Sequence, residues 1–222
     1  MKKLVLLFAA LLVAGCGEKS SSEGSESASE NPTPSNESAE PSGDTPKSLS
    51  DADVERLLKE AVDFDSLEER DDLFYQNNEP YSGWAKGMYD SGQAKGLGQF
   101  KDGKQDGLEM RWHENGQKQA EIIWKDGKQD GLMTVWHENG QKQYEGIWKD
   151  GKQDGLVTTW HENGQKQGEG TYKDGELDGP YTAWHADGQK QSEGTYKDGE
   201  EVSAKYWNSK GEEVETVEES AE

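Results

Sequence analysis

Hydrophobic and polar residues alternate in short runs along most of the chain, and glycine-containing pairs separate these runs. Asn-Gly pairs such as Asn115-Gly116 take turns with Asp-Gly pairs such as Asp126-Gly127. Because Asn and Gly tolerate positive φ, we expect the Asn-Gly pairs to form short hairpin turns and the Asp-Gly pairs to mark a second, longer turn. The pattern predicts antiparallel strands and no helix in this part of the chain.

One unit of 24 residues recurs. Trp-His-Glu-Asn-Gly begins at positions 112, 136 and 160, Trp-His-Ala-Asp-Gly begins at 184, and Lys-Asp-Gly recurs from 101 to 197 at the same period. A fixed period of this length is typical of repeat proteins, in which each unit packs only on its neighbours. Each unit is one hairpin, so we expect an all-β fold: an elongated, single-layer antiparallel meander of about 12 strands.

Alternation also predicts which side chains share a face of this sheet. Leu108, Met110 and Trp112 lie on one face of a first strand, and we expect Ala120 and Ile122 of the second strand to join them. Two aromatic columns would then cover strand glycines as a thin core. Their members are Trp112, Trp136, Trp160 and Trp184 in one column, and Trp124, Trp148, Tyr172 and Tyr196 in the other.

The opposite face is our candidate interaction face, because a regular, acidic and partly apolar surface suits a protein partner. It carries Glu121, Glu145, Glu169 and Glu193, and we place Met133, Val135, Val157 and Tyr181 beside them. A solvated face that keeps the protein soluble is the alternative.

A short amphipathic helix is expected ahead of the repeats, at about residues 51–62. Ser50 is placed to cap it, and Val54, Leu57, Leu58 and Ala61 follow at helical spacing. We expect this helix to close one edge of the sheet, since open edges invite aggregation. At the other end, residues 211–222 form an acidic tail that discourages further pairing.

The N-terminus has the pattern of a targeting segment. Lys2 and Lys3 precede an uncharged apolar run, Leu4 to Ala14, which is shorter than the ~20 residues needed to span a membrane. The run ends at Gly15-Cys16, and Cys16 is the only cysteine. This resembles a bacterial lipobox, which implies cleavage between Gly15 and Cys16, a covalent lipid on Cys16 and stable anchoring in a membrane of the cell envelope. In a Gram-negative host, Gly17 would favour the outer membrane.

The predicted organisation has five parts. They are a lipoprotein signal peptide (1–15), a lipid anchor with a disordered acidic linker rich in Ser, Glu and Pro (16–48), a helical N-terminal cap (49–72), the hairpin repeats (73–210) and the acidic tail (211–222).

The hairpin units resemble a known repeat family. The segment from Tyr144 to Gly155 is similar to a MORN repeat, with spaced Tyr, Gly and Trp. The variant with Asn-Gly-Gln after the Trp resembles the repeats of YwqK-type bacterial proteins, and Leu73-Phe74-Tyr75 with Pro80 to Trp84 is similar to the way those proteins begin. The resemblance implies the meander fold and, because the YwqK-type proteins are described as antitoxins, a role in toxin binding.

Charge narrows the classes of partner. The formal net charge of −22 disfavours nucleic acids and anionic lipid headgroups, and it would suit a basic protein such as a basic toxin. Membrane contact is therefore expected through the lipid anchor.

The sequence offers no convincing catalytic or metal chemistry. The histidines His113, His137, His161 and His185 stand one repeat apart, about 9–10 Å in a sheet, whereas two ligands of one zinc ion lie within about 4 Å of each other. The Asp-Gly-Lys-Gln-Asp-Gly turns hold too few acids for an EF-hand. We therefore expect a non-enzymatic protein without cofactors: a scaffold or immunity protein, with cell-wall glycan binding as the alternative.

Overall fold

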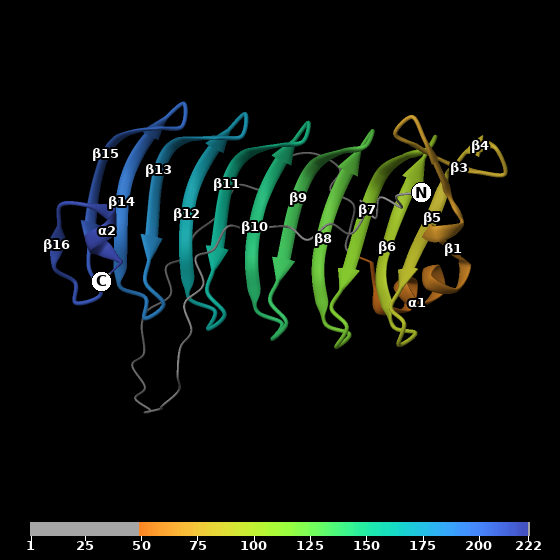
Figure 1. Cartoon of the computed structure of the whole chain (residues 1–222), viewed down its shortest axis with the longest axis horizontal. Coiled ribbons are helices and arrows are strands. Elements are labelled where there is room, and N and C mark those ends of the chain that lie inside the picture. Colours follow the sequence, from red (N-terminus) through yellow and green to blue (C-terminus); the bar gives the residue numbers. More distant parts are fainter. Residues whose placement is uncertain (1–48, 222) are drawn as a thin grey trace. The chain divides into compact units, whose positions relative to one another are not determined.

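The computed structural model describes residues 49–221, so the predicted signal peptide, Cys16 and the predicted linker lie outside the described residues. The described part is dominated by one open, 13-stranded sheet (Figure 1). Its long strands are β5 (Gly83–Met88), β6 (Ala94–Lys101), β7 (Lys104–Trp112), β8 (Lys118–Lys125), β9 (Lys128–Trp136), β10 (Lys142–Lys149), β11 (Lys152–Trp160), β12 (Lys166–Lys173), β13 (Glu176–Trp184), β14 (Lys190–Lys197) and β15 (Glu200–Trp207).

These long strands follow one another in the sheet in chain order, and each is antiparallel to its neighbours. Equivalent strands recur every 24 residues, as β7, β9, β11 and β13 show. The prediction of a single-layer antiparallel meander of 24-residue hairpins is thereby confirmed.

The two turns have the opposite lengths to those predicted. Lys125 pairs with Lys128, so Asp126 and Gly127 alone form the tight turn, with φ values of 49° and 81°. Positive φ at both central residues defines the type I′ hairpin turn, which matches the twist of the flanking strands. The Asn-Gly end is the longer connection, because residues 113–117 separate the paired Trp112 and Lys118.

A β-bulge follows this longer connection and decides which side chains share a face. Trp112 pairs with Lys118 but Arg111 pairs with Ala120, so Gln119 is an extra residue in β8. An extra residue reverses the side-chain alternation of the strand relative to its partner. Trp112 consequently lies on the face of Glu121, and Ala120, Ile122 and Trp124 lie on the other face, which corrects the predicted assignment.

We call the two sides the glutamate face and the core face. The glutamate face carries Glu121, Glu145, Glu169 and Glu193, together with the first tryptophan column. The core face carries the main apolar cluster, made of Ala120, Ile122, Met133, Val135, Tyr144 and Val157, with Trp124, Trp148 and Tyr172 packed against it. The prediction that both aromatic columns face the strand glycines is therefore right for the second column and wrong for the first.

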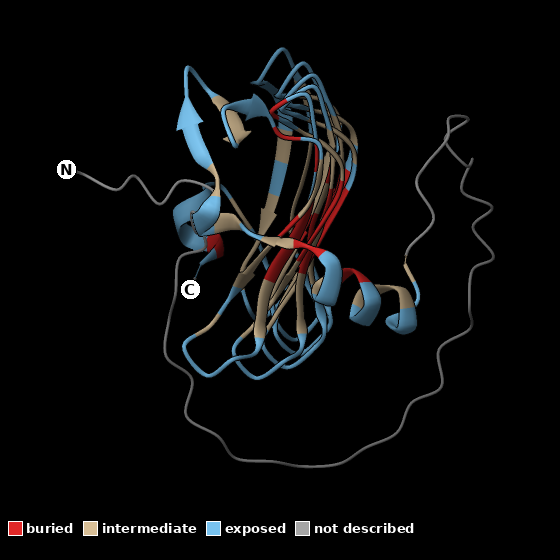
Figure 2. Cartoon of the chain, turned by 90° about the vertical axis from the view of Figure 1, so that its right-hand side faces the viewer, coloured by how far each residue is buried: buried red, intermediate tan, exposed pale blue. Residues whose placement is uncertain are grey.

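Helix α1 (Asp51–Glu60) begins after Ser50, whose Oγ accepts a hydrogen bond from the Asp53 N–H, as predicted. Leu57 and Ala61 bury themselves against Leu97 on the glutamate face of β6. Figure 2, seen from the β5 end, shows that the strands are bent and that α1 lies against one side of them. The helix thus covers a face of the sheet, while β1 (Val62–Asp63) pairs in parallel with the outer edge of β5.

The rest of the N-terminal region is less helical than predicted. It holds η1 (Phe64–Ser66) and a separate three-stranded sheet of β2 (Glu68–Arg70), β3 (Leu73–Gln76) and β4 (Glu79–Pro80). The predicted start of the repeats at residue 73 therefore belongs to this small sheet, and the repeat sheet proper begins at Gly83. Phe64, Phe74 and Phe100 pack ring against ring and join the two sheets.

The C-terminal segment is also more ordered than an acidic tail. Strand β16 (Glu213–Val214) pairs with β15 at Tyr206 and Trp207, and α2 (Val217–Ser220) follows with Ser220 fully buried. This short strand and helix blunt the edge of β15. Side chains are nevertheless less buried toward this end of the sheet. In β14 and β15 no residue is buried.

Candidate interaction surface

A repeating trio of side chains forms the central feature of the glutamate face. The ammonium groups of Lys118, Lys142, Lys166 and Lys190 lie 5.3, 5.5, 5.8 and 5.5 Å from the ring centres of Trp136, Trp160, Trp184 and Trp207, which belong to the following hairpins. Each lysine also forms an ion pair with the glutamate three residues later, at 2.6 Å for Lys118 and Glu121. The trio links successive repeats by cation–π and ionic contacts.

An apolar stripe runs beside this trio on the same face. Leu132 and Leu156 are large hydrophobic residues that remain 42% and 52% exposed. Leu132 lies opposite Ile147 in the neighbouring strand, and Ile147 is half-buried. Exposed leucines at the same position of consecutive repeats form a patch, and such patches on soluble proteins mark interaction sites more often than scattered hydrophobic residues do.

The structure divides the eight residues of the predicted interaction face between the two sides of the sheet. Glu121, Glu145, Glu169 and Glu193 lie on the glutamate face, with side chains 22% to 43% exposed. Met133, Val135 and Val157 are buried in the apolar cluster of the core face, and Tyr181 lies on that face opposite Gly170. The prediction was wrong for these four residues, which belong to the core face. The β-bulge places positions 133, 135, 157 and 181 opposite core-face residues of the neighbouring strands.

Sequence reasoning overlooked the lysines, the first tryptophan column and the exposed leucines as parts of this surface. The missing information was the bulge at Gln119 and its equivalents. One signal was present in the sequence, because the tight Asp-Gly turn leaves the longer connection at His113–Gln117, where an extra residue is most easily accommodated.

The four histidines join neighbouring repeats through the backbone. The Nε2–H groups of His113, His137, His161 and His185 donate to the carbonyl oxygens of Trp136, Trp160, Trp184 and Trp207 at 2.9–3.1 Å. At the other end of the hairpins, the N–H of Gly127 donates to the carbonyl of Gln105, and later Asp-Gly turns repeat this bond. Among residues 49–221, no cluster of three or more His, Cys, Asp or Glu side chains is arranged to hold a metal ion.

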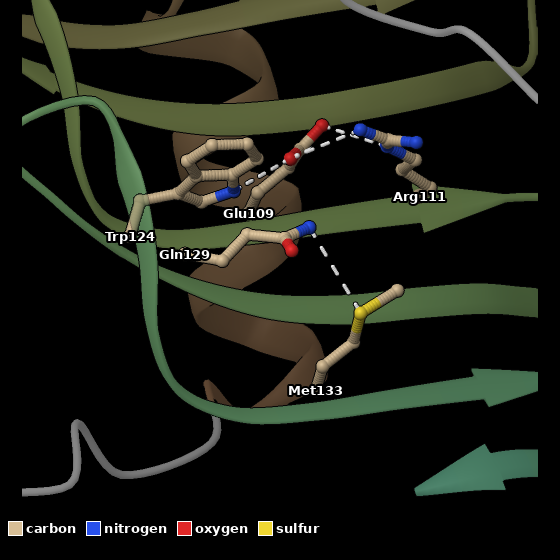
Figure 3. A network of polar contacts seen from close by, with 5 residues as sticks. All are labelled: Glu109, Arg111, Trp124, Gln129 and Met133. Atoms are coloured by element: carbon tan, nitrogen blue, oxygen red, sulfur yellow. Dashed lines mark hydrogen bonds and ion pairs between the residues drawn. The ribbon is translucent and has the colours of Figure 1, made fainter. Parts of the chain in front are cut away.

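A buried ion pair interrupts the core face at β7 (Figure 3). Glu109 is only 2% exposed, and its carboxylate accepts bonds from the Arg111 guanidinium at 2.7 Å and from Trp124 Nε1 at 2.8 Å. The equivalent residues one repeat later are Met133 and Val135. Glu109 is buried and Arg111 is mostly buried, so the pair contributes to the packing of the core face.

Tyrosines line the rest of the core face. Burial raises the pKa of Tyr144 and of Tyr181 above the ordinary value. Near the C-terminal edge, the hydroxyls of Tyr196 and Tyr206 both donate to Glu201, at 3.3 and 2.7 Å. The bond to Glu201, helped by desolvation, raises the pKa of Tyr206 to about 12. The hydroxyls of Tyr196 and Tyr206 thus act as hydrogen-bond donors, whereas the Tyr144 hydroxyl accepts hydrogen bonds from Trp148 Nε1 and Gln153 Nε2.

Four consecutive hairpins match the family model of the MORN repeat variant, at residues 105–126, 129–150, 153–174 and 177–198. The protein is a MORN-like repeat protein. No protein among the curated sequences matches it. Each matched MORN unit contains one Trp, one Lys and one Glu of the glutamate face, and its Lys contacts the Trp that follows in the next hairpin.

MORN repeats indicate a binding or scaffold role. The surface of this MORN sheet has the properties such a role requires: it is regular, open and amphipathic. Within the described residues 49–221, none of the helices has both the length and the apolar character that crossing a membrane demands.

Proposed function

We propose that this MORN-like repeat protein is a non-catalytic lipoprotein of the bacterial cell envelope whose glutamate face binds a protein. The observation that carries the proposal is the row of Trp, Lys and Glu residues beside the exposed Leu132 and Leu156. Apolar side chains ringed by polar ones are the usual composition of a protein interface. No cofactor takes part in this function apart from the covalent lipid on Cys16.

The anchor is supported by the sequence alone. The apolar run Leu4 to Ala14 before Gly15-Cys16 is the basis for placing the mature N-terminus at Cys16. Two or more acyl chains hold a protein stably in a membrane, whereas one chain binds weakly. In a Gram-negative host we place the protein at the outer membrane.

We further propose that the partner is a toxin and that the protein confers immunity. The support is the resemblance to YwqK-type antitoxin repeats and the net charge of −22, which favours a basic partner and speeds its association. The lipid anchor would restrict this partner to toxins met outside the cytoplasm. The alternative is that the protein acts as a scaffold for resident proteins of the cell envelope.

Cell-wall glycan binding is the second candidate, and the tryptophans on the glutamate face give it a specific basis. Trp136, Trp160 and Trp184 are half-buried and lie on the open side of the sheet. A lysine ammonium already covers each ring, however, which leaves less of the flat surface that sugars stack on. Protein binding is therefore favoured.

The test is to capture partners of the full-length chain in its native host by crosslinking. A tagged protein that keeps Cys16 is compared with Cys16→Ser, in which the anchor is absent and the repeats are intact. We expect the lipidated form in the membrane fraction to retain one small secreted protein. A set of resident envelope proteins would support a scaffold and reject immunity, and retention of peptidoglycan fragments without protein would reject the proposal.

A further inference from the structure

The glutamate face already holds one amphipathic helix, which is α1 of the chain itself. Leu57 and Ala61 of this segment pack on Leu97 of β6, and the half-buried Trp84 and Trp112 flank the contact. The Nζ of Lys86 on β5 donates to the Leu58 carbonyl at 2.8 Å, near the C-terminal end of the helix. The contact shows how this side of the sheet receives a helix.

The residues that receive α1 have equivalents in later repeats. At the 24-residue period, Trp84 corresponds to Leu132 and Leu156, and Trp112 corresponds to Trp136 and Trp160. The apolar positions of the α1 contact therefore recur as apolar residues along the rest of the face. In the described part of the chain α1 covers only the first set, and Leu132 and Leu156 remain exposed.

One position of the α1 contact is apolar in the first repeat and acidic in the later ones. Leu97, which lies at the centre of the α1 contact, becomes Glu121, Glu145, Glu169 and Glu193 in the later repeats. A helix with the apolar character of α1 at this point would meet a row of carboxylates. A partner that keeps the apolar contacts therefore needs Lys or Arg where α1 has Leu57 and Ala61.

We propose that the glutamate face of β9–β13 binds a basic amphipathic helix of a partner protein. This rests on the proposed function, in which the partner is a protein, and it specifies where and by which structure that partner binds. The helix would lie with apolar residues on Leu132, Leu156 and the tryptophans, and with basic residues along the glutamates. Four strand spacings of about 4.8 Å give ~19 Å, which matches a helix of ~13 residues.

The existing Lys–Glu pairs do not prevent this. Lys142 and Glu145 form an ion pair with side chains 44% and 35% exposed, and exposed pairs contribute little stability. An arginine from the partner can bind the same carboxylate while the lysine stays on the neighbouring indole. An amphipathic helix would then lie on the face of the sheet, where several anchor side chains define its position.

A peptide based on α1 supplies the probe. Residues 49–61 are synthesised with Leu57→Lys and Ala61→Lys, the two positions that would face the glutamates, and with Asp53→Lys and Glu60→Lys to make the peptide basic; binding to the full-length chain is measured by fluorescence anisotropy. We expect the basic peptide to bind at least about tenfold more tightly than the natural acidic peptide, because its charge complements the glutamates. A scrambled peptide of the same composition controls for charge alone, and equal binding by the scrambled peptide would overturn the proposal.

Variants of the protein locate the site. Leu132→Ser with Leu156→Ser should weaken binding of the basic peptide at least about tenfold, by removing the exposed apolar anchors. Val202→Ser is the control, because Val202 on β15 is an even more exposed hydrophobic residue away from the stripe, and it should change binding less than about twofold. Circular dichroism verifies that every variant keeps the sheet. Equal loss in both variants contradicts the proposal.

A photo-crosslinking amino acid separates failure of this inference from failure of the proposed function. It is placed at Leu156 on the glutamate face, and at Tyr181 on the core face in a second protein, and both are expressed in the native host. Crosslinked peptides at position 156 with apolar residues at helical spacing and flanking Lys or Arg support the inference. Crosslinks at position 156 to a protein segment without this pattern overturn the inference while leaving the proposed function intact, and protein crosslinks only at position 181, or at neither position, reject both.

Discussion

At the scale of single residues, Glu109 illustrates how a buried charge depends on its partner. Its carboxylate is enclosed with the Arg111 guanidinium, whose side chain is 16% exposed. Removing one member of such a pair leaves the other charge poorly solvated, which costs about 3–5 kcal/mol. The equivalent positions Met133 and Val135 show that an apolar pair also fits the sheet at this point.

We therefore expect Glu109→Met alone to lower the free energy of unfolding by about 3 kcal/mol, because Arg111 loses its carboxylate. Glu109→Met with Arg111→Val reproduces the next repeat and should recover more than half of that loss. Trp124 Nε1 still lacks its acceptor in the double variant, so recovery is incomplete. Urea unfolding measures both, and a double variant no more stable than the single one would contradict this account.

Tyr206 gives a prediction for alkaline pH. Its pKa is raised from 10.0 to about 12 in the folded protein, chiefly by the hydrogen bond to Glu201. A raised folded-state pKa contributes stability that is fully present below pH 10 and is lost as the pH rises toward 12. We expect Tyr206→Phe to remove this part of the pH dependence between pH 10 and 12.

The pKa of Tyr206 is measured by titrating tyrosinate absorbance in the natural protein, in Tyr206→Phe and in Glu201→Gln. Glu201→Gln should lower the highest tyrosine pKa, because the hydroxyl loses its hydrogen bond to a charged carboxylate, whose negative charge also disfavours the tyrosinate. An unchanged titration in both variants would show that Tyr206 is not the group with a pKa of about 12.

At the scale of the element, two hairpins solve the same packing problem differently. In β10, Tyr144 lies over Gly146, where an added Cβ would come within 2.5 Å of the tyrosine hydroxyl oxygen. In β8 the equivalent residues are Ala120 and Ile122, both buried. A large residue at the first position requires glycine at the second, and a small one permits isoleucine.

A double-mutant cycle in β10 tests this coupling. Gly146→Ile should destabilise the protein through a clash with the Tyr144 ring, and Tyr144→Ala through the cavity it leaves, by about 3 kcal/mol. The double variant should be more stable than the sum of the two by about 1–3 kcal/mol. Thermal and urea unfolding provide the free energies, and strict additivity would show that the two sites are independent.

The period and strand content of these elements could be predicted from the sequence, because Asp-Gly, Asn-Gly and the tryptophans recur at fixed spacing. The faces could not, since they depend on one bulge residue per hairpin. Gln119 pairs with nothing opposite in the register, and a shift of one residue exchanges the two sides of a strand. Met133 and Val135 were misplaced for this reason, whereas the glutamates do lie on the side opposite Ala120 and Ile122.

The ends of the sheet were harder to predict than its middle. Leu73-Phe74-Tyr75 has the composition of a repeat strand, yet β3 pairs with β2 and β4 in a separate small sheet, and only ring contacts such as Phe74 with Phe100 connect it to the repeat sheet. Glu213 and Val214 pair with β15 despite the acidic surroundings. Non-repeating segments have no internal copies to compare, so only their tertiary contacts decide their structure.

At the scale of the whole sheet, each hairpin is bonded to its neighbours through the same histidine and glycine contacts. Removing one complete unit, residues 129–152, joins Lys128 to Gln153 and restores the same local sequence. We expect this shortened protein to fold, with a maximum dimension in solution scattering reduced by about 9–10 Å, the width of two strands.

Deletion of residues 129–140 is the control, because it removes about one strand and leaves the following chain running in the wrong direction for its neighbours. That protein should lose the cooperative unfolding transition seen by circular dichroism. If both deletions fold equally well, the hairpin is not the unit of assembly.

The decline in burial from β6 toward β15 has a consequence for biosynthesis. Strands β6 to β9 hold well enclosed side chains, such as Leu97, Ile122 and Met133, and they leave the ribosome before the less buried β14 and β15. Each later hairpin can then pair with a strand that has already folded. The sheet is therefore extended from its N-terminal strands toward its C-terminal ones while the chain is still being made. β16 and α2 arrive last and end the growth.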